Sequence, residues 1–178
     1  MEFTLNKSQR LVTNAAAKDE SRPVLTCVHI RKGIIEAANG YTLVQKHIDY
    51  DGNEELLIKA KELAKCKDKE GKVTFSKGEG NEIRAVGQET IILEAQSGKF
   101  PNAASLYPKT VGDEVLERLR GKGPFKVALS AMELLNVLRS TDEHILKLYF
   151  YGGSKPVEFR IGDIRGMIMP MQVNWEEN

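Results

Sequence analysis

The sequence is poor in the features that mark several specialised classes of protein. Its 178 residues include only two cysteines, Cys27 and Cys66, and neither has a cysteine or histidine nearby at metal-site spacing. No apolar run approaches the roughly 18 residues of a membrane-spanning helix. The N-terminus also lacks the apolar core of a signal peptide. These absences predict a soluble cytoplasmic protein whose cysteines are free thiols.

An excess of charge of one sign is lacking as well. Lysine and arginine total 26 against 25 aspartate and glutamate, which leaves a net charge of +1. The chain as a whole therefore has no field that would attract nucleic acid. Any basic surface must be local.

No recognisable catalytic motif is present. His29, His47 and His144 have no cysteine or carboxylate at metal-ligand spacing, and no phosphate-binding loop, nucleophile elbow or dinucleotide fingerprint occurs. An enzyme is therefore the disfavoured class. We expect a non-catalytic protein with no metal and no cofactor.

The patterns that are present predict an α+β protein with helices packed on antiparallel sheets. Asn6 and Ser130 are candidate N-caps, and Glu133 stands in the capping-box position after Ser130. Helices are expected over 7–18, 60–67, 111–120 and 130–139. Strands are expected over 2–5, 24–30, 34–38, 42–50, 55–59, 73–77, 82–86, 90–94, 126–129, 145–151, 157–161 and 166–173.

The order of these elements divides the chain. Residues 1–97 contain two successive passes of helix and small strands, a weak repeat of element order without sequence identity. Residues 98–109, with two prolines in an irregular stretch, indicate a linker. Residues 110–178 repeat the scheme in shortened form.

Two local features stand out. Between Lys59 and Lys77 the chain has seven lysines against three acidic residues, which indicates either a solvated face or a surface for sequence-independent contact with DNA phosphates. Near the C-terminus, Met167, Met169 and Met171 surround Pro170. They are either buried strand residues or the lining of an accessible groove for apolar peptide side chains.

Four segments carry a resemblance to a known family. MIMPMQV at 167–173 resembles the C-terminal VMPMRL-type motif of the bacterial sliding clamp, the beta subunit of the replicative DNA polymerase. SRPVLTCVHI at 21–30, AANGYTLV at 37–44 and GKFPNAASLYPK at 98–109 resemble further clamp motifs in the same order. The resemblance implies a shortened DNA-clamp fold. Residues 1–109 correspond to the middle clamp domain and residues from about 122 to 173 to the second half of the last domain, with no counterpart of the first domain.

The family implies a DNA-binding face. Clamp helices line the inside of a ring and present basic side chains to duplex DNA without reading its sequence. The candidates for this face are Lys7, Arg10, Lys18, Lys59, Lys61, Lys65 and Lys67.

The family also implies a hydrophobic pocket that holds a short peptide of a DNA polymerase or repair protein. The matching positions are Leu25, Gly40, Tyr41, Leu43, Pro101, Leu106, Met167, Met169, Pro170 and Met171. The chain departs from the motifs at Ala38-Asn39, Tyr41-Thr42 and Gln172. Because two family arginines are lost there, we expect a different peptide specificity.

The assembly expected from the resemblance is a ring that a clamp loader places on DNA. Complete clamps surround the hole with about twelve helices, so four helices per chain require three copies and three helices require four. The sequence does not choose between these, and it leaves a dimer or a monomer open as well. The alternative is a clamp-derived adaptor or decoy that binds peptides and does not encircle DNA.

Overall fold

The computed structural model describes residues 1–107 and 126–175, without the side chain of Ala104. Its helices are α1 (Lys7–Arg10), η1 (Leu11–Ala15), η2 (Pro23–Thr26), α2 (Ala60–Leu63), η3 (Ala103–Ser105) and α4 (Ala131–Arg139), where η marks a 3₁₀ helix. Its strands are β1 (Glu2–Asn6), β2 (Cys27–Arg31), β3 (Ile34–Ala38), β4 (Thr42–His47), β5 (Leu56–Lys59), β6 (Lys72–Lys77), β7 (Glu82–Val86), β8 (Thr90–Glu94), β9 (Leu146–Tyr149), β10 (Val157–Ile161) and β11 (Ile164–Ile168). The helix expected over 111–120 lies outside the described residues.

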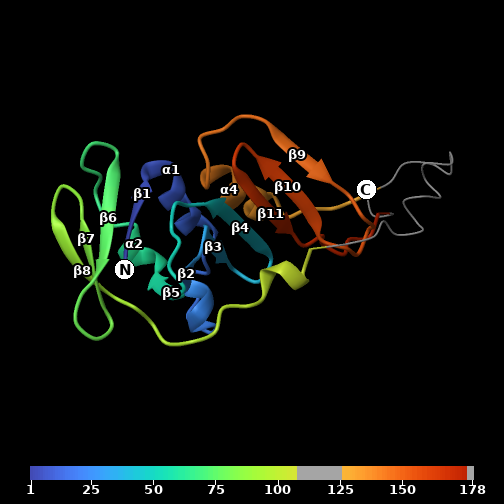
Figure 1. Cartoon of the computed structure of the whole chain (residues 1–178). Coiled ribbons are helices and arrows are strands. Elements are labelled where there is room, and N and C mark those ends of the chain that lie inside the picture. Colours follow the sequence, from blue (N-terminus) through green and yellow to red (C-terminus); the bar gives the residue numbers. More distant parts are fainter. Residues whose placement is uncertain (108–125, 176–178) are drawn as a thin grey trace.

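The strands form two antiparallel sheets. One has the order β1-β6-β7-β8 and the other the order β5-β2-β3-β4-β11-β10-β9. Figure 1 shows the four-stranded sheet at one end of the molecule and β9–β11 at the other, with α4 against the second sheet. Strands β4 and β11 pair from Thr42 with Ile168 to Lys46 with Ile164. The longer sheet therefore joins parts of the chain on both sides of the expected linker.

Residues 2–94 contain two units with the same element order of strand, helix and three strands. The first strand of each unit pairs with the second strand of the other, β1 with β6 and β5 with β2. Alternation buries Phe3 and Leu5 of β1 opposite Phe75 and Val73 of β6, and the two phenylalanine rings stack 5.1 Å apart. The repeat of element order expected from the sequence is thus a pair of interlocked units.

The first two helices are shorter than expected. Asn6 caps α1, as expected, and the structure adds a complete capping box with Gln9. After Arg10, however, the chain continues as 3₁₀ helix and becomes extended at Ala16, because Val12, Thr13 and Asn14 are weak helix formers. Helix α2 ends at Leu63, after which the N–H groups of Lys65 and Cys66 bond three residues back, to the carbonyls of Glu62 and Leu63, in a tighter turn than an α-helix has.

Three expected strands are also corrected. Residues 23–26 form the 3₁₀ helix η2, with Pro23 at its first position and the Thr26 hydroxyl donating to the Pro23 carbonyl. Residues 126–129 contribute one bridge, from Ala128 to Met171. Strand β11 ends at Ile168, two residues before Pro170, which has no N–H for a ladder. The other expected strands are confirmed to within a few residues.

Candidate functional site

An apolar pocket of about 350 Å³ lies where the start of β4, the end of β11 and residues 100–106 meet. Five stretches of the chain supply its walls, namely 22–25, 38–43, 100–106, Pro156 and 167–169. Eight of the ten residues expected in the peptide pocket line it: Leu25, Gly40, Tyr41, Leu43, Pro101, Leu106, Met167 and Met169. The fold therefore brings most of the predicted site together.

The pocket has a buried floor and an exposed rim. Leu25, Leu43 and Met167 are less than 10% exposed and join Phe100 in a separate core cluster. Tyr41 and Leu106 are well exposed, and Met169 is 40% exposed. A fixed floor with apolar surface still free at the rim suits the side chains of an incoming apolar peptide.

Pro170 and Met171 correct the predicted pocket. Neither lines it, because the chain leaves the wall after Met169. The N–H of Met171 donates to the Ala128 carbonyl over 2.9 Å, which holds residue 171 against the segment before α4.

Sequence reasoning missed other residues of the wall: Arg22, Ala38, Thr42, Phe100, Ala103 and Pro156. Phe100 and Ala103 stand inside the segment GKFPNAASLYPK, so the signal for them was present in the motif. Pro156 precedes β10 and had no such signal. It reaches the pocket because β10 pairs with β11.

A hydrogen-bonded turn shapes the rim. The Asn39 side-chain oxygen accepts from the N–H groups of Tyr41 and Thr42, both over 2.9 Å, and Gly40 has a φ of +97°. The Glu133 carboxylate of α4 accepts from the Asn39 amide over 2.6 Å and from the Thr42 hydroxyl over 2.8 Å. Glu133 therefore fixes the turn that carries Tyr41, a role that the sequence did not indicate.

The segment before residue 108 is anchored at two points. The Phe100 ring stacks on His29 with a centroid separation of 4.9 Å. The Tyr107 hydroxyl donates to the Gln45 oxygen over 2.8 Å, and the Arg165 guanidinium lies 3.9 Å from the centre of the Tyr107 ring. Burial raises the pKa of Tyr107, so it remains a neutral donor.

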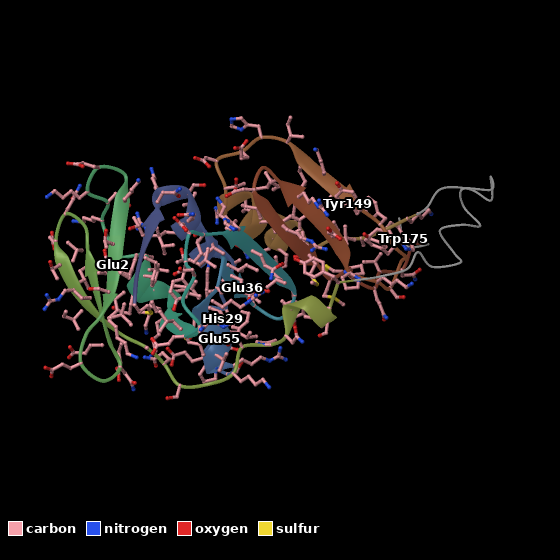
Figure 2. The ribbon with its side chains drawn as sticks, viewed as in Figure 1. Glu2, His29, Glu36, Glu55, Tyr149 and Trp175 are labelled. Carbon is pink, nitrogen blue, oxygen red and sulfur yellow. The ribbon has the colours of Figure 1, made fainter. Side chains whose placement is uncertain are left out.

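A buried carboxylate supports this anchor. Glu36 is 1% exposed and accepts from His29 over 2.9 Å, from Arg31 over 3.0 Å and from Gln45, while His29 also contacts Glu55 (Figure 2). Burial by itself raises the pKa of Glu36, but these hydrogen bonds outweigh burial and hold the pKa below 4.5. Glu36 is thus an ionised group that orients His29 beneath Phe100.

The lysines expected on a DNA-binding face gather around α1, η1 and α2. Helices η1 and α2 are in contact. Lys7 and Lys67 line one hollow between these elements, and Lys18, Lys59 and Lys61 line another. Lys61 and Lys65 form exposed ion pairs with Glu20 and Glu62, over 3.6 Å and 2.8 Å. Exposed pairs of this kind contribute little, so their lysines remain available to phosphates.

Arg10 is a correction to this set. It is 9% exposed, and its guanidinium donates to the Cys66 carbonyl and to the Asp68 carboxylate. Its charge therefore joins α1 to the chain after α2 and does not face solvent.

Residues 1–107 and 126–175 contain no cluster of three metal-ligating side chains. No helix in that part of the chain is long and apolar enough to cross a membrane. Cys27 and Cys66 are free and buried, and burial raises the pKa of both thiols.

Neither a protein-family model nor a curated protein matches the sequence. Solved structures do match the fold. The DNA polymerase III beta subunit of Pseudomonas aeruginosa superposes with a TM-score of 0.74 at 15% identity, covering 97% of this chain and 66% of that one. The beta chain of Streptococcus pneumoniae gives 0.71 at 15% identity, with 97% and 65% covered. The DNA polymerase sliding clamp of Bacillus subtilis gives 0.70 at 14% identity, with 98% and 65% covered.

The chain therefore has an α+β fold of small helices packed on antiparallel sheets, in the arrangement of the DNA polymerase sliding clamps. That arrangement is the fold of the bacterial DNA polymerase III beta subunit. The resemblance carried by the four sequence motifs is confirmed at the level of the fold. The chain spans slightly less than two thirds of the length of the structures it matches.

Proposed function

We propose that the protein is a sliding-clamp-like processivity factor. It encircles duplex DNA in the cytoplasm as a homo-oligomeric ring, without catalysing a reaction. Through its apolar pocket it tethers a DNA polymerase or another DNA-processing protein, and a clamp loader opens the ring onto DNA. The clamp fold at TM-scores of 0.70 to 0.74 supports the ring.

The observation that carries the proposal is the pocket. Eight residues chosen from sequence motifs, in four separate stretches of chain, line one cavity of about 350 Å³. A surface that had lost the partner would have no reason to keep an apolar rim exposed, because exposed apolar area favours aggregation. The pocket therefore favours a peptide ligand with apolar side chains.

Contact with DNA is assigned to six lysines, namely Lys7, Lys18, Lys59, Lys61, Lys65 and Lys67. Lysine is a point charge on a flexible stem, so it attracts phosphate without fixing the position of a base. Contacts of this kind are salt-dependent and allow the protein to move along the duplex. Retention then depends on the closed ring and only weakly on these contacts.

Retention on circular DNA tests the proposal. Protein loaded on nicked circular DNA is passed over a sizing column in 0.5 M salt, before and after one double-strand cut. A clamp elutes with the circle and is released after the cut. Equal elution from intact and cut DNA contradicts encirclement.

The alternative is a clamp-derived adaptor that binds the peptide and does not encircle DNA. The apolar pocket would serve that role equally well, because it needs no ring to accept a peptide. The adaptor predicts peptide binding by a monomer and no difference between circular and linear DNA.

A further inference from the structure

The C-terminal part of the chain repeats the second unit of the N-terminal part. Residues 126–129, α4, β9, β10 and β11 follow the order of β5, α2, β6, β7 and β8. In both units the first stretch bridges to a residue that follows the last strand, Ile58 to Ala95 and Ala128 to Met171, one and three residues after the strand ends. Leu146 and Leu148 of β9 pack on the core as Val73 and Phe75 of β6 do.

In the N-terminal part, the core of each unit is covered by a strand of the other unit. Strand β6 is covered by β1, and β5 is paired with β2, so each unit lends its first strand to the other. Under this cover Val73 and Phe75 are fully buried.

The C-terminal unit has no such cover within the described residues. The seven-stranded sheet ends at β9, and no described strand lies beyond it. Leu146 and Leu148 are only half-buried, and nearby Ile145 is well exposed. An open strand edge with half-covered apolar side chains is a surface for pairing with another strand.

Helix α4 also has an exposed apolar flank. Glu133 and Asn136 line the hollow toward the loop after η1, and Val137 enters the core. At 100° per residue, Leu135 and Leu138 lie on the opposite side of the helix. Leu138 is 43% exposed and Leu135 is 38% exposed.

We infer that the C-terminal unit is half of a domain and that a second copy of the chain completes it. The unit has one extended stretch, residues 126–129, whose pairing among the described residues is the single bridge to Met171, and one edge, β9, that such a stretch would cover from a second copy. Two copies related by a two-fold axis satisfy both needs reciprocally, as the two N-terminal units already do. The flanks of α4 with Leu135 and Leu138 then face each other.

A second copy fits better than an unrelated partner, because the chain itself supplies both the extended stretch and the open edge that would pair. The described chain supplies three helices to the row around a clamp hole, α1 continued by η1, α2 and α4. Two such pairs, four copies in all, would supply about twelve helices. The ring of four copies rests on the proposed function, whereas the interface between two copies rests on the repeated units alone.

The pairing register predicts a specific cross-link. Ser130 caps α4 as Asn6 caps α1, and Leu146 and Leu148 take the places of Val73 and Phe75. Since Thr4 pairs with Thr74, Ala128 of one copy lies opposite Lys147 of the other. The double variant Ala128→Cys/Lys147→Cys should form a covalent dimer on mild oxidation, because paired strands bring Cα atoms within disulfide reach.

The single variants Ala128→Cys and Lys147→Cys are the matched controls, since neither has its partner cysteine across the interface. They should remain monomeric on a non-reducing gel. Absence of the covalent dimer in the double variant, or equal dimer in a single variant, overturns the proposed register.

Solution mass provides the second test. Leu138→Glu places two charges at the two-fold contact and should weaken association at least about tenfold in sedimentation equilibrium. Val86→Glu, at a site that is 42% exposed on β7, is the control and should leave the mass unchanged. A wild-type protein that stays at 19.9 kDa as its concentration rises, or a mass unaffected by Leu138→Glu, overturns the inference.

The two proposals fail separately. A covalent dimer without retention on circular DNA removes the clamp function and leaves the interface standing. Retention on circular DNA without the cross-link supports the clamp function and removes the proposed interface.

Discussion

Met169 gives the sharpest test of the pocket, because a neighbouring methionine is its natural control. Both side chains are exposed, 40% for Met169 and 52% for Met171, but only Met169 lines the pocket. Fully burying a methionine contributes about 2 to 3 kcal/mol, so covering the exposed two fifths of Met169 contributes about 1 kcal/mol. Met169→Ala should therefore weaken peptide binding about fivefold.

Met169→Asp should cost more, because the bound peptide would also desolvate a carboxylate. An added penalty of about 1 to 3 kcal/mol takes the total loss to roughly 30-fold or more. Met171→Asp should change the affinity by less than about twofold. The assay is fluorescence anisotropy with a labelled clamp-binding peptide of a bacterial replicative polymerase. Equal loss in the two aspartate variants, or no loss in Met169→Asp, would refute the pocket assignment.

Three further predictions concern the DNA face, the buried carboxylate and the joint between the sheets. Lys61→Ala/Lys67→Ala should lower the slope of log affinity against log salt for duplex DNA by about 1.8, measured by anisotropy, while Lys77→Ala on β6 leaves it unchanged. Glu36→Gln should destabilise the fold by about 3 kcal/mol at pH 7 in urea unfolding, because Arg31 and His29 lose a buried partner. Since the folded pKa of Glu36 is lowered, its contribution to the free energy of unfolding is present above pH 4.5 and is lost as the pH falls through the folded pKa. If the stability difference between the wild type and Glu36→Gln stayed the same at lower pH, Glu36 would not be the ionised partner of Arg31 and His29. Gly166→Ala should lower the unfolding midpoint, because a Cβ there overlaps the Leu43 carbonyl and the Phe159 ring, and a neutral result would mean that β4 and β11 are not joined as described.

The parts of the fold that could be predicted from the sequence are those set by local patterns. Alternating apolar residues predicted β6, β7 and β8, and Asn6 predicted the start of α1. The pocket was predicted through motif order, because each motif occupies its own wall.

The errors come from partners that are distant in the sequence. Arg10 has the pattern of a surface residue on a basic helix, but its partner Asp68 lies 58 positions away. Met171 belongs to the methionine motif, but a bridge to Ala128 draws it from the pocket. The carboxylate of Glu133 accepts hydrogen bonds from Asn39 and Thr42, 94 and 91 positions earlier, in place of the capping interaction expected at Ser130. Local propensity carries no information about such contacts.

The two proposed activities depend on different parts of the structure. Every lysine of the proposed DNA face lies between Lys7 and Lys67, in the part of the chain that contains α1, η1, β5 and α2. The floor of the pocket, by contrast, contains Leu43 and Met167, which are opposite each other in the β4–β11 pairing. Loosening that pairing separates the two floor residues without moving the lysines. Gly166→Ala should therefore lose peptide affinity while its salt-dependent binding to linear DNA is retained, a separation that a generally unfolded variant would not show.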